Sequence, residues 1–329
     1  MEHLIEFLIF FAKVFVIVIG IIAVVGFIVS QSIKGQHHLP NLELETINET
    51  FKNYADTLRK KVLDHKAYKE FEKQEKKRSK SKEKEKKPKI YVIDFDGDIK
   101  ASAVNNLRME ISTVLDVATP RDEVLVRVTS PGGMVHTYGL AAAQLTRVRN
   151  ANIPLCVSVD KVAASGGYLM ACTANKIIAS PFAILGSIGV LAQVPNFHRL
   201  LKKHDIDYEE YTAGDYKRTI SMFGEITDKG KEKFTEQIAD THELFKNFVK
   251  EHRPIVDIDK VGTGEPWFGK RALDHKLIDE IKTSDEYFFE RKDSHDIVKV
   301  KLAEKKKFGE KIAEQLRLTV TSLFEQFRV

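Results

Sequence analysis

The sequence predicts an α/β fold with parallel strands, preceded by a single N-terminal membrane-spanning helix. Three short apolar runs have the length and composition of buried strands: IYVIDF at 90–95, EVLVRV at 123–128 and PLCVSV at 154–159. Stretches with apolar residues at helical spacing lie between them, at 105–117 and 138–148. Strands that alternate with helices favour parallel pairing, and 329 residues are ample for such a core.

The N-terminal segment is almost continuously apolar. From Val14 to Val29 every residue is apolar or glycine, a run that is too long for a signal-peptide core and suits a membrane span of about 20 residues. The following SQSIKGQHHLP offers no small-residue cleavage site, so we expect an uncleaved anchor over residues 1–33. Lys13 is then expected to extend its amine to the near interface.

A lysine-rich, low-complexity segment over residues 34–89 separates this anchor from the predicted domain. Residues 52–89 carry sixteen Lys/Arg against seven Asp/Glu, and the whole chain has a net charge of +5. The rest of the chain is therefore mildly acidic, which argues against a basic surface for nucleic acid. The segment is either a solvated, partly helical linker or a site of attraction to anionic lipid headgroups.

The predicted domain occupies residues 90–295. Its run KIIASPFAILGSIGVL is strand-like, and Pro181 and Ser187 within it favour a place in the core over a second membrane span. A helix is expected over 227–249, with apolar side chains near one face. Residues 296–329 form the predicted C-terminal tail, an amphipathic helix in its last part.

The two cysteines, Cys156 and Cys172, lie in apolar runs. They form neither a zinc-ligand spacing nor a disulfide framework, so we expect both to be small core residues. The sequence predicts no metal and no cofactor.

Two Gly-Gly turns follow predicted strands. The first, TSPGGMV at 129–135, lacks both phosphate-loop patterns, so it is either an oxyanion hole of backbone amides or a plain turn. The second, in DKVAASGGYLMA, places Ser165 near a helix N-terminus, where negative charge is stabilised. There Ser165 is either a nucleophile or an N-cap, and Ala163 breaks the hydrolase pattern G-x-S-x-G.

A serine nucleophile needs a base. His136 lies beside the first Gly-Gly turn, but no histidine has an obvious orienting carboxylate. A lysine can serve if burial lowers its pKa. Lys217, in YTAGDYKRTISMFGE, stands outside the charge runs that hold most lysines, although a surface lysine remains the alternative.

The segments SPGG, AASGGY, GSIGV and AGDYK occur in this order along the chain. Together they resemble the signal peptide peptidase A family (peptidase family S49) of serine-lysine membrane proteases, and most closely its SohB-like branch. GEPWFGKRALDHKLIDEI is similar to a later segment of the family, and the resemblance covers residues 90–281.

The resemblance implies a role for each motif. Ser165 is expected to be the nucleophile, Lys217 the general base, and Ser187 the residue that hydrogen-bonds and orients that lysine. Gly132 and the Ser165 amide are expected to form the oxyanion hole. The implied fold is crotonase/ClpP-like, built from repeated ββα turns, and it assembles into rings. Whether one subunit completes its own site is open, because long family members supply serine and lysine from different halves.

The expected function is a membrane-anchored serine endopeptidase of peptides such as released signal peptides or membrane protein fragments. The expected partners are these peptides, the lipid bilayer and further copies of the chain, without nucleic acid. Alternatives are a noncatalytic membrane scaffold and an acyl-CoA enzyme of the crotonase fold, neither of which needs a Ser-Lys pair. We expect a single-pass protein of the bacterial inner (plasma) membrane. The family favours a periplasmic domain, whereas the positive-inside rule favours a cytoplasmic one.

Overall fold

The structure, a computed structural model, describes residues 7, 9–20, 41–82 and 87–303. The chain divides into two compact units: Leu42–Leu302 forms one, and the residues that flank it on both sides form the other. In the flanking unit residues 9–20 are helical with exposed side chains. No helix in the described part of the chain is both long and apolar enough to span a membrane. The predicted anchor beyond residue 20 and the predicted helix in the tail lie outside the described residues.

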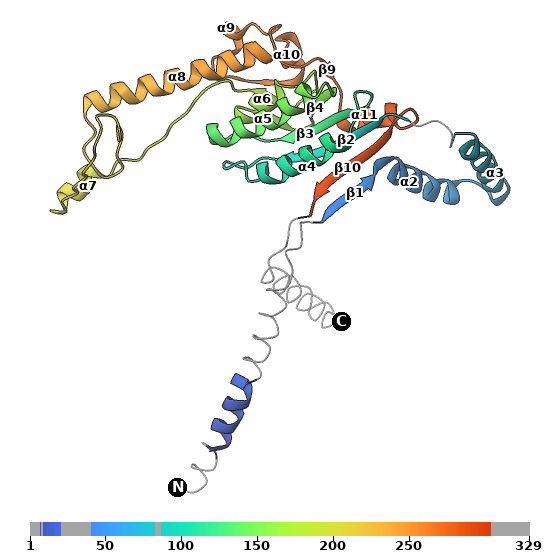
Figure 1. Ribbon diagram of the computed structural model, residues 1–329, viewed down its shortest axis with the longest axis horizontal. Coiled ribbons are helices and arrows are strands. Elements are labelled where there is room, and N and C mark those ends of the chain that lie inside the picture. The colour runs from blue at the N-terminus through green and yellow to red at the C-terminus, as the bar shows by residue number, and fades with distance from the viewer. Residues whose placement is uncertain (1–6, 8, 21–40, 83–86, 304–329) are drawn as a thin grey trace. The chain divides into compact units, whose positions relative to one another are not determined.

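A seven-stranded sheet forms the centre of the larger unit (Figure 1). All neighbouring strands are parallel, except that the N-terminal strand at one edge of the sheet is antiparallel to its neighbour. The α/β fold with a parallel sheet is therefore confirmed. In spatial order the strands are β1 (Leu42–Thr46), β10 (Asp296–Leu302), β2 (Lys89–Asp96), β3 (Glu123–Thr129), β4 (Leu155–Val159), β6 (Lys176–Ala179) and β9 (Glu280–Ile281).

Both faces of this sheet are buried. Successive side chains of a strand point to opposite faces, so one strand contributes to the core on each side. In β2, Tyr91, Ile93 and Phe95 join the core on one face, and Ile90 and Val92 join the core on the other. The first face is covered by α4 (Val104–Val117), α5 (Val135–Asn150) and α6 (Gly166–Ala171). The second is covered by α11 (Ser284–Arg291) and the start of α2 (Ile47–Val62).

A second sheet of three short strands lies beside the first. Its strands are β5 (Val162–Ala164), β7 (Ile184–Gly186) and β8 (Pro266–Phe268), with β5 and β7 parallel and β8 antiparallel to β7. The run KIIASPFAILGSIGVL supplies β6 and β7 and belongs to the core, as predicted, with Leu185 fully buried. Cys156 and Cys172 are also free and buried, as predicted.

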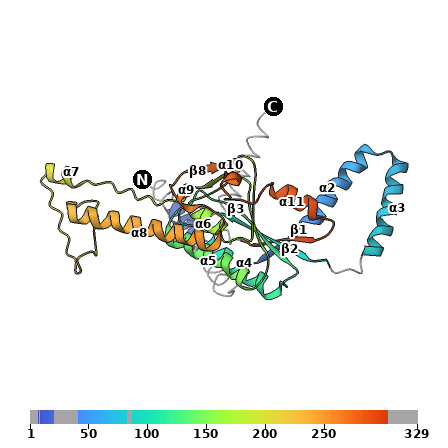
Figure 2. The same cartoon turned by 90° about the horizontal axis from the view of Figure 1, so that it is seen from above.

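The helix predicted over 227–249 is confirmed as α8 (Asp228–His252), which begins at an N-cap where Thr227 accepts a hydrogen bond from the Gly230 amide. Its first half and the segment before it, with α7 (His198–Lys203), extend away from the two sheets (Figures 1 and 2). Two short helices follow, α9 (Ile258–Val261) and α10 (Gly269–Asp274). In the lysine-rich segment, α2 and α3 (His65–Lys82) form a helical hairpin.

An ion cluster connects three strands of the main sheet. Arg127 of β3 donates to both carboxylate oxygens of Asp94 in β2, at 2.6 and 2.8 Å, and Lys299 of β10 lies 2.8 Å from the same carboxylate. Burial alone raises the pKa of Asp94, but the hydrogen bonds from Arg127 and Lys299 outweigh it and lower that pKa below its ordinary value.

Candidate active site

Two serines follow neighbouring strands of the second sheet. Because Ala164 of β5 pairs with Gly186 of β7, Ser165 and Ser187 come next to each other at the ends of these strands. Both have φ of +51°, a conformation that costs a non-glycine residue about 1–3 kcal/mol. Ser165 directly precedes α6, so its side chain stands at the point where a strand turns into a helix.

The loop after β3 lies against this serine. Gly132 has φ of +95°, and a Cβ added to it would lie 2.7 Å from the Ser165 Cβ. Only glycine therefore permits this approach. The adjacent Gly166 faces the ring of Tyr138, which occupies the space that a side chain would need. The Gly-Gly turns of the sequence thus serve close contact between three segments: the 130–133 loop, α5 and the start of α6.

A buried hydrogen-bond chain holds the loop in place. The Tyr138 hydroxyl donates to the Asp98 carbonyl at 2.7 Å and lies 2.5 Å from Ser130 Oγ, which accepts from the Gly132 amide at 3.1 Å. With those roles assigned, the Ser130 hydroxyl donates to the Tyr138 oxygen, so the hydroxyls of Ser130 and Tyr138 each donate one hydrogen bond and accept one. Burial raises the pKa of Tyr138, which keeps its hydroxyl protonated.

Both amides predicted for the oxyanion hole have acceptors in this conformation. The Ser165 amide donates to the Gly186 carbonyl at 2.8 Å, and the Gly132 amide donates to Ser130 Oγ. The next residues along the chain, Gly133 and Gly166, line the cavity in front of Ser165. The Gly166 amide is the first of α6 and has no partner within the helix.

Ser165 opens onto a cavity of about 190 Å³. Apart from Ser165 and Thr241, its walls are glycine and apolar side chains, which suits an apolar group bound beside the serine. The lining residues are Gly133, Val135, Gly139, Ser165, Gly166, Leu169, Gly189, Val190, Thr241, Leu244, Phe245 and Phe248.

One wall of the cavity comes from α8, which sequence reasoning did not assign to the site. Leu244, Phe245 and Phe248 form an apolar helix face that the sequence predicts, but no local signal tells which part of the fold such a face covers.

Two histidines lie near this cavity. His242 of α8 has Nε2 3.0 Å from the Ile188 carbonyl, close to the cavity. His136 is exposed in the first turn of α5, next to the cavity residue Val135.

The structure does not bring Lys217 to Ser165 within one chain. Lys217 is exposed in the segment between α7 and α8, and it is not among the residues that line the cavity at Ser165. The adjacent Tyr216 ring lies 5.1 Å from the Lys233 amine, near the start of α8. From Lys233 to the cavity residue Phe245 the helix rises by about 18 Å.

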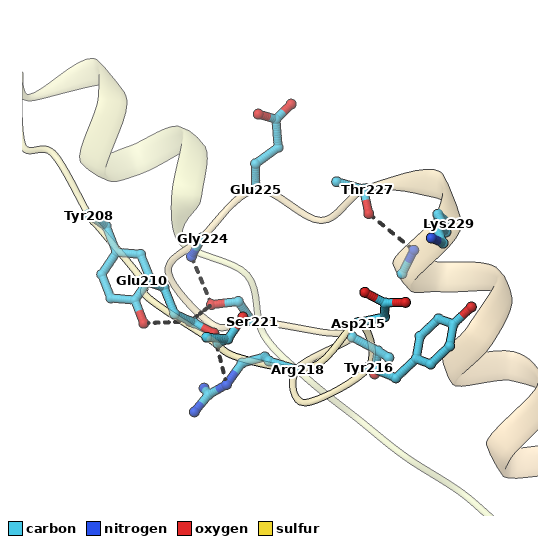
Figure 3. A pocket seen from close by; sticks show the side chains of 13 residues that line it. Tyr208, Glu210, Asp215, Tyr216, Arg218, Ser221, Gly224, Glu225, Thr227 and Lys229 are labelled. Atoms are coloured by element: carbon cyan, nitrogen blue, oxygen red, sulfur yellow. Dashed lines mark hydrogen bonds and ion pairs between the residues drawn. The ribbon is translucent and has the colours of Figure 1, made fainter.

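The segment that carries Lys217 forms a polar hollow, although Lys217 is not among the residues that line it (Figure 3). It encloses about 440 Å³, and Tyr216 and Arg218 line it on either side of Lys217 in the chain. Glu210 pairs with Arg218 at 3.1 Å and accepts from the Tyr208 hydroxyl at 2.8 Å, while Ser221 Oγ accepts from the Gly224 amide at 2.9 Å. The predicted base therefore stands on an ordered loop that has its own hydrogen bonds.

Within the described ranges, no group of three or more His, Cys, Asp or Glu side chains could hold a metal ion.

Comparison with protein families gives two adjacent matches. Residues 2–145 match the model described as peptidase family S49 N-terminal, and residues 147–298 match peptidase family S49. The first match includes the loop at Gly132, and the second includes Ser165, Ser187 and Lys217.

Individual relatives cover most of the chain. A probable protease SohB of Haemophilus influenzae is 47% identical, over 97% of this chain and 94% of that protein. A probable protease SohB of Buchnera aphidicola subsp. Schlechtendalia chinensis is 44% identical, over 88% of this chain and 100% of that protein. Among solved structures, a mutant of the 1510-N membrane-bound stomatin-specific protease has a TM-score of 0.41 and 14% identity, covering 63% of this chain and 86% of that one.

Proposed function

The chain belongs to peptidase family S49, and from this premise we propose that it is a membrane-anchored serine endopeptidase whose nucleophile is Ser165 and whose general base is Lys217. The observation that carries the proposal is the position of Ser165, which has a strained backbone, stands at the start of α6 and opens onto an apolar cavity. Strain at a non-glycine residue persists where the surrounding structure holds it, and such residues cluster at functional sites.

The proposed base comes from a neighbouring copy of the chain. A lysine acts as a base only as a neutral amine, which requires burial, and Lys217 is exposed in one chain. Lys217 lies on the segment 190–227, the arm, which also exposes many large apolar side chains, among them Leu191, Leu200 and Tyr211. Exposed large apolar side chains that are gathered on one segment are typical of a protein–protein interface. Assembly would cover the arm, bury Lys217 and complete the site at Ser165, with Ser187 orienting the amine.

The proposed reaction follows from these roles. The neutral Lys217 amine takes the proton of the Ser165 hydroxyl as the oxygen attacks the peptide carbonyl carbon. When the tetrahedral intermediate collapses, the ammonium returns this proton to the leaving amine and an acyl-enzyme remains. The amine then takes a proton from water, the resulting hydroxide attacks the ester, and the acid product leaves as Ser165 regains its proton.

The developing oxyanion would lie between the 132–133 loop and the start of α6. Gly132 and the Ser165 amide remain the proposed donors, and in the present conformation each would have to leave its internal acceptor. Gly133 and Gly166 already line the cavity and offer the neighbouring amides. Removing one such donor typically costs about 10²–10³ in kcat.

The proposed substrates are peptides with an apolar side chain at the cleavage point, such as released signal peptides or fragments of membrane proteins. The apolar walls contributed by Leu169, Leu244 and Phe248 support this class. We further propose a crotonase/ClpP-like fold, which the succession of β4, β5 and α6 as a ββα unit supports.

We also propose a single N-terminal membrane span, which the apolar run Val14–Val29 supports. The proposed location is the bacterial inner membrane, with the protease domain on the periplasmic side.

Co-expression of two inactive full-length variants tests both the dyad and its division between subunits. Ser165→Ala and Lys217→Ala should each abolish peptide cleavage, while mixed assemblies should regain activity at about one quarter of their sites, because each active site needs one subunit of each kind. No recovery would place both groups in one subunit. Cleavage by the Ser165→Ala chain alone would rule out this nucleophile. A wild-type chain that neither cleaves peptides nor reacts with a serine-directed phosphonate would support the noncatalytic scaffold instead.

A further inference from the structure

The helix α2 carries an apolar stripe that runs off the folded core. Apolar side chains recur every three or four residues along it, so they share one face of the helix. The first two, Ile47 and Phe51, pack against the core beneath the main sheet. The next three, Tyr54, Leu58 and Val62, are 74, 64 and 71% exposed.

The neighbouring helix α3 lies against a different side of α2. Arg59 faces α3, where its guanidinium lies 4.4 Å from the centre of the Phe71 ring. One residue corresponds to a rotation of about 100° around a helix, so Arg59 and Leu58 point in distinct directions. The hairpin therefore presents the outer half of the stripe on its surface rather than between its helices.

The hairpin is also strongly basic. Residues 47–82 contain twelve Lys/Arg against six Asp/Glu. Three of the cations, Arg59, Lys60 and Lys61, occupy the last turn of α2. Lys61 borders the stripe, because it lies about 60° around the helix from Leu58. An apolar helix face bordered by lysine and carrying an aromatic residue is the arrangement that binds in the interface of a bilayer.

We propose that the hairpin of α2 and α3 binds the surface of an anionic lipid bilayer, with Tyr54, Leu58 and Val62 inserted among the lipids and the lysines on their phosphates. The positive charge of the hairpin favours an anionic bilayer over a second copy of the chain. A second copy of the hairpin would bring two surfaces of the same sign together, whereas anionic lipid headgroups attract a cluster of lysines. This inference goes beyond the proposed protease and depends on neither Ser165 nor Lys217.

An environment-sensitive fluorophore on the stripe tests the proposal in the full-length chain. Leu58→Cys supplies the attachment point for acrylodan, and the native Cys156 and Cys172 are fully buried, with burial raising the pKa of Cys156 to about 12. The matched control is Asn53→Cys, also exposed but about 140° around the helix from Leu58. Both labelled chains are reconstituted in phosphatidylcholine vesicles with and without phosphatidylglycerol.

The acrylodan emission at position 58 should shift to shorter wavelength when phosphatidylglycerol is present, and high salt or Lys60→Glu/Lys61→Glu should reverse the shift. The emission at position 53 should stay that of a probe in water. A vesicle-bound chain with no lipid-dependent difference between the two positions overturns the proposal. A shift at position 58 that depends on protein concentration and not on phosphatidylglycerol also overturns it, because the stripe then binds another copy.

Discussion

The hydroxyl of Tyr138 and Ser130 Oγ lie 2.5 Å apart, and through this contact α5 holds the loop in front of Ser165. The same tyrosine ring packs against Gly166 at the start of α6. One buried side chain therefore sets the position of both segments between which the oxyanion is proposed to lie. Tyr138 is a positioning residue in this arrangement, since it acts on the substrate only through these segments.

Tyr138→Phe should lower kcat about tenfold and leave KM nearly unchanged, because the loop at Gly132 loses a hydrogen-bonded support that matters most in the transition state. Steady-state cleavage of a fluorogenic peptide measures both constants. The control is Tyr287→Phe, which removes a hydroxyl bonded to Glu123 on the opposite face of the sheet. Equal losses in the two variants, or a change confined to KM, would argue against a positioning role.

Peptide cleavage should increase toward alkaline pH as a single group loses its proton. A lysine amine in water has a pKa of about 10.4, and burial lowers such a value by as much as about 3–5 units. Lys217→Arg should be inactive at every pH, because a guanidinium stays protonated. The pH dependence of kcat/KM for the full-length chain tests this. Substantial cleavage by a folded Lys217→Ala chain would contradict it and direct attention to His136.

Gly139→Leu should narrow the range of peptides that are cleaved. Gly139 lines the cavity from α5, and a Cβ added to it meets no atom within 4 Å, so the leucine should fill the space. Cleavage after large apolar residues should fall by about 10–200-fold relative to cleavage after alanine. Gly139→Ala is the control, since it improves the helix by a similar amount without filling the cavity. Unchanged selectivity in the leucine variant would mean that this cavity does not bind the substrate side chain.

Acid should destabilise the larger unit through Asp94. Its pKa is lowered in the folded chain, so the ionised carboxylate contributes stability above the unfolded pKa of about 3.9, and this contribution disappears as the pH falls through the lower folded value. Glu280, whose pKa Lys176 and Lys282 lower to about 2, acts in the same direction. Urea unfolding of Asp94→Asn and of the wild type at several pH values measures the effect. The difference in unfolding free energy should shrink toward acid pH; a constant difference would contradict the assignment.

Local patterns predict the elements that the core requires. The apolar runs at 90–95, 123–128 and 154–159 became β2, β3 and β4, and the helical spacings between them became α4 and α5. The edge strand β1 and its neighbour β10 escaped prediction, because β1 is mostly exposed and its partner lies about 250 residues away along the chain. Pairing over such a distance leaves no local signal.

The parts of the candidate site also differ in whether local sequence patterns predict them. Ser165 and Ser187 stand out in the sequence because each lies in a small-residue turn after a strand, and the register of β5 and β7 brings them together. The cavity wall on α8 and the separation of Lys217 from Ser165 depend on how a long helix extends from the core. Motif order along a chain contains no information on that distance.

The strand pair β1 and β10 also determines how the larger unit responds to mechanical force. The Ala303 amide donates to the Asn41 carbonyl at 2.8 Å, directly beside the paired Leu42 and Leu302. Tension applied through the two flanking segments therefore enters at one end of an antiparallel pair and opens it residue by residue, from Leu42 toward Thr46, instead of shearing all five pairs at once. Strands opened in this way separate at low force. Tension between the two flanking segments therefore separates β1 from β10 before it acts on the strands that lead to Ser165.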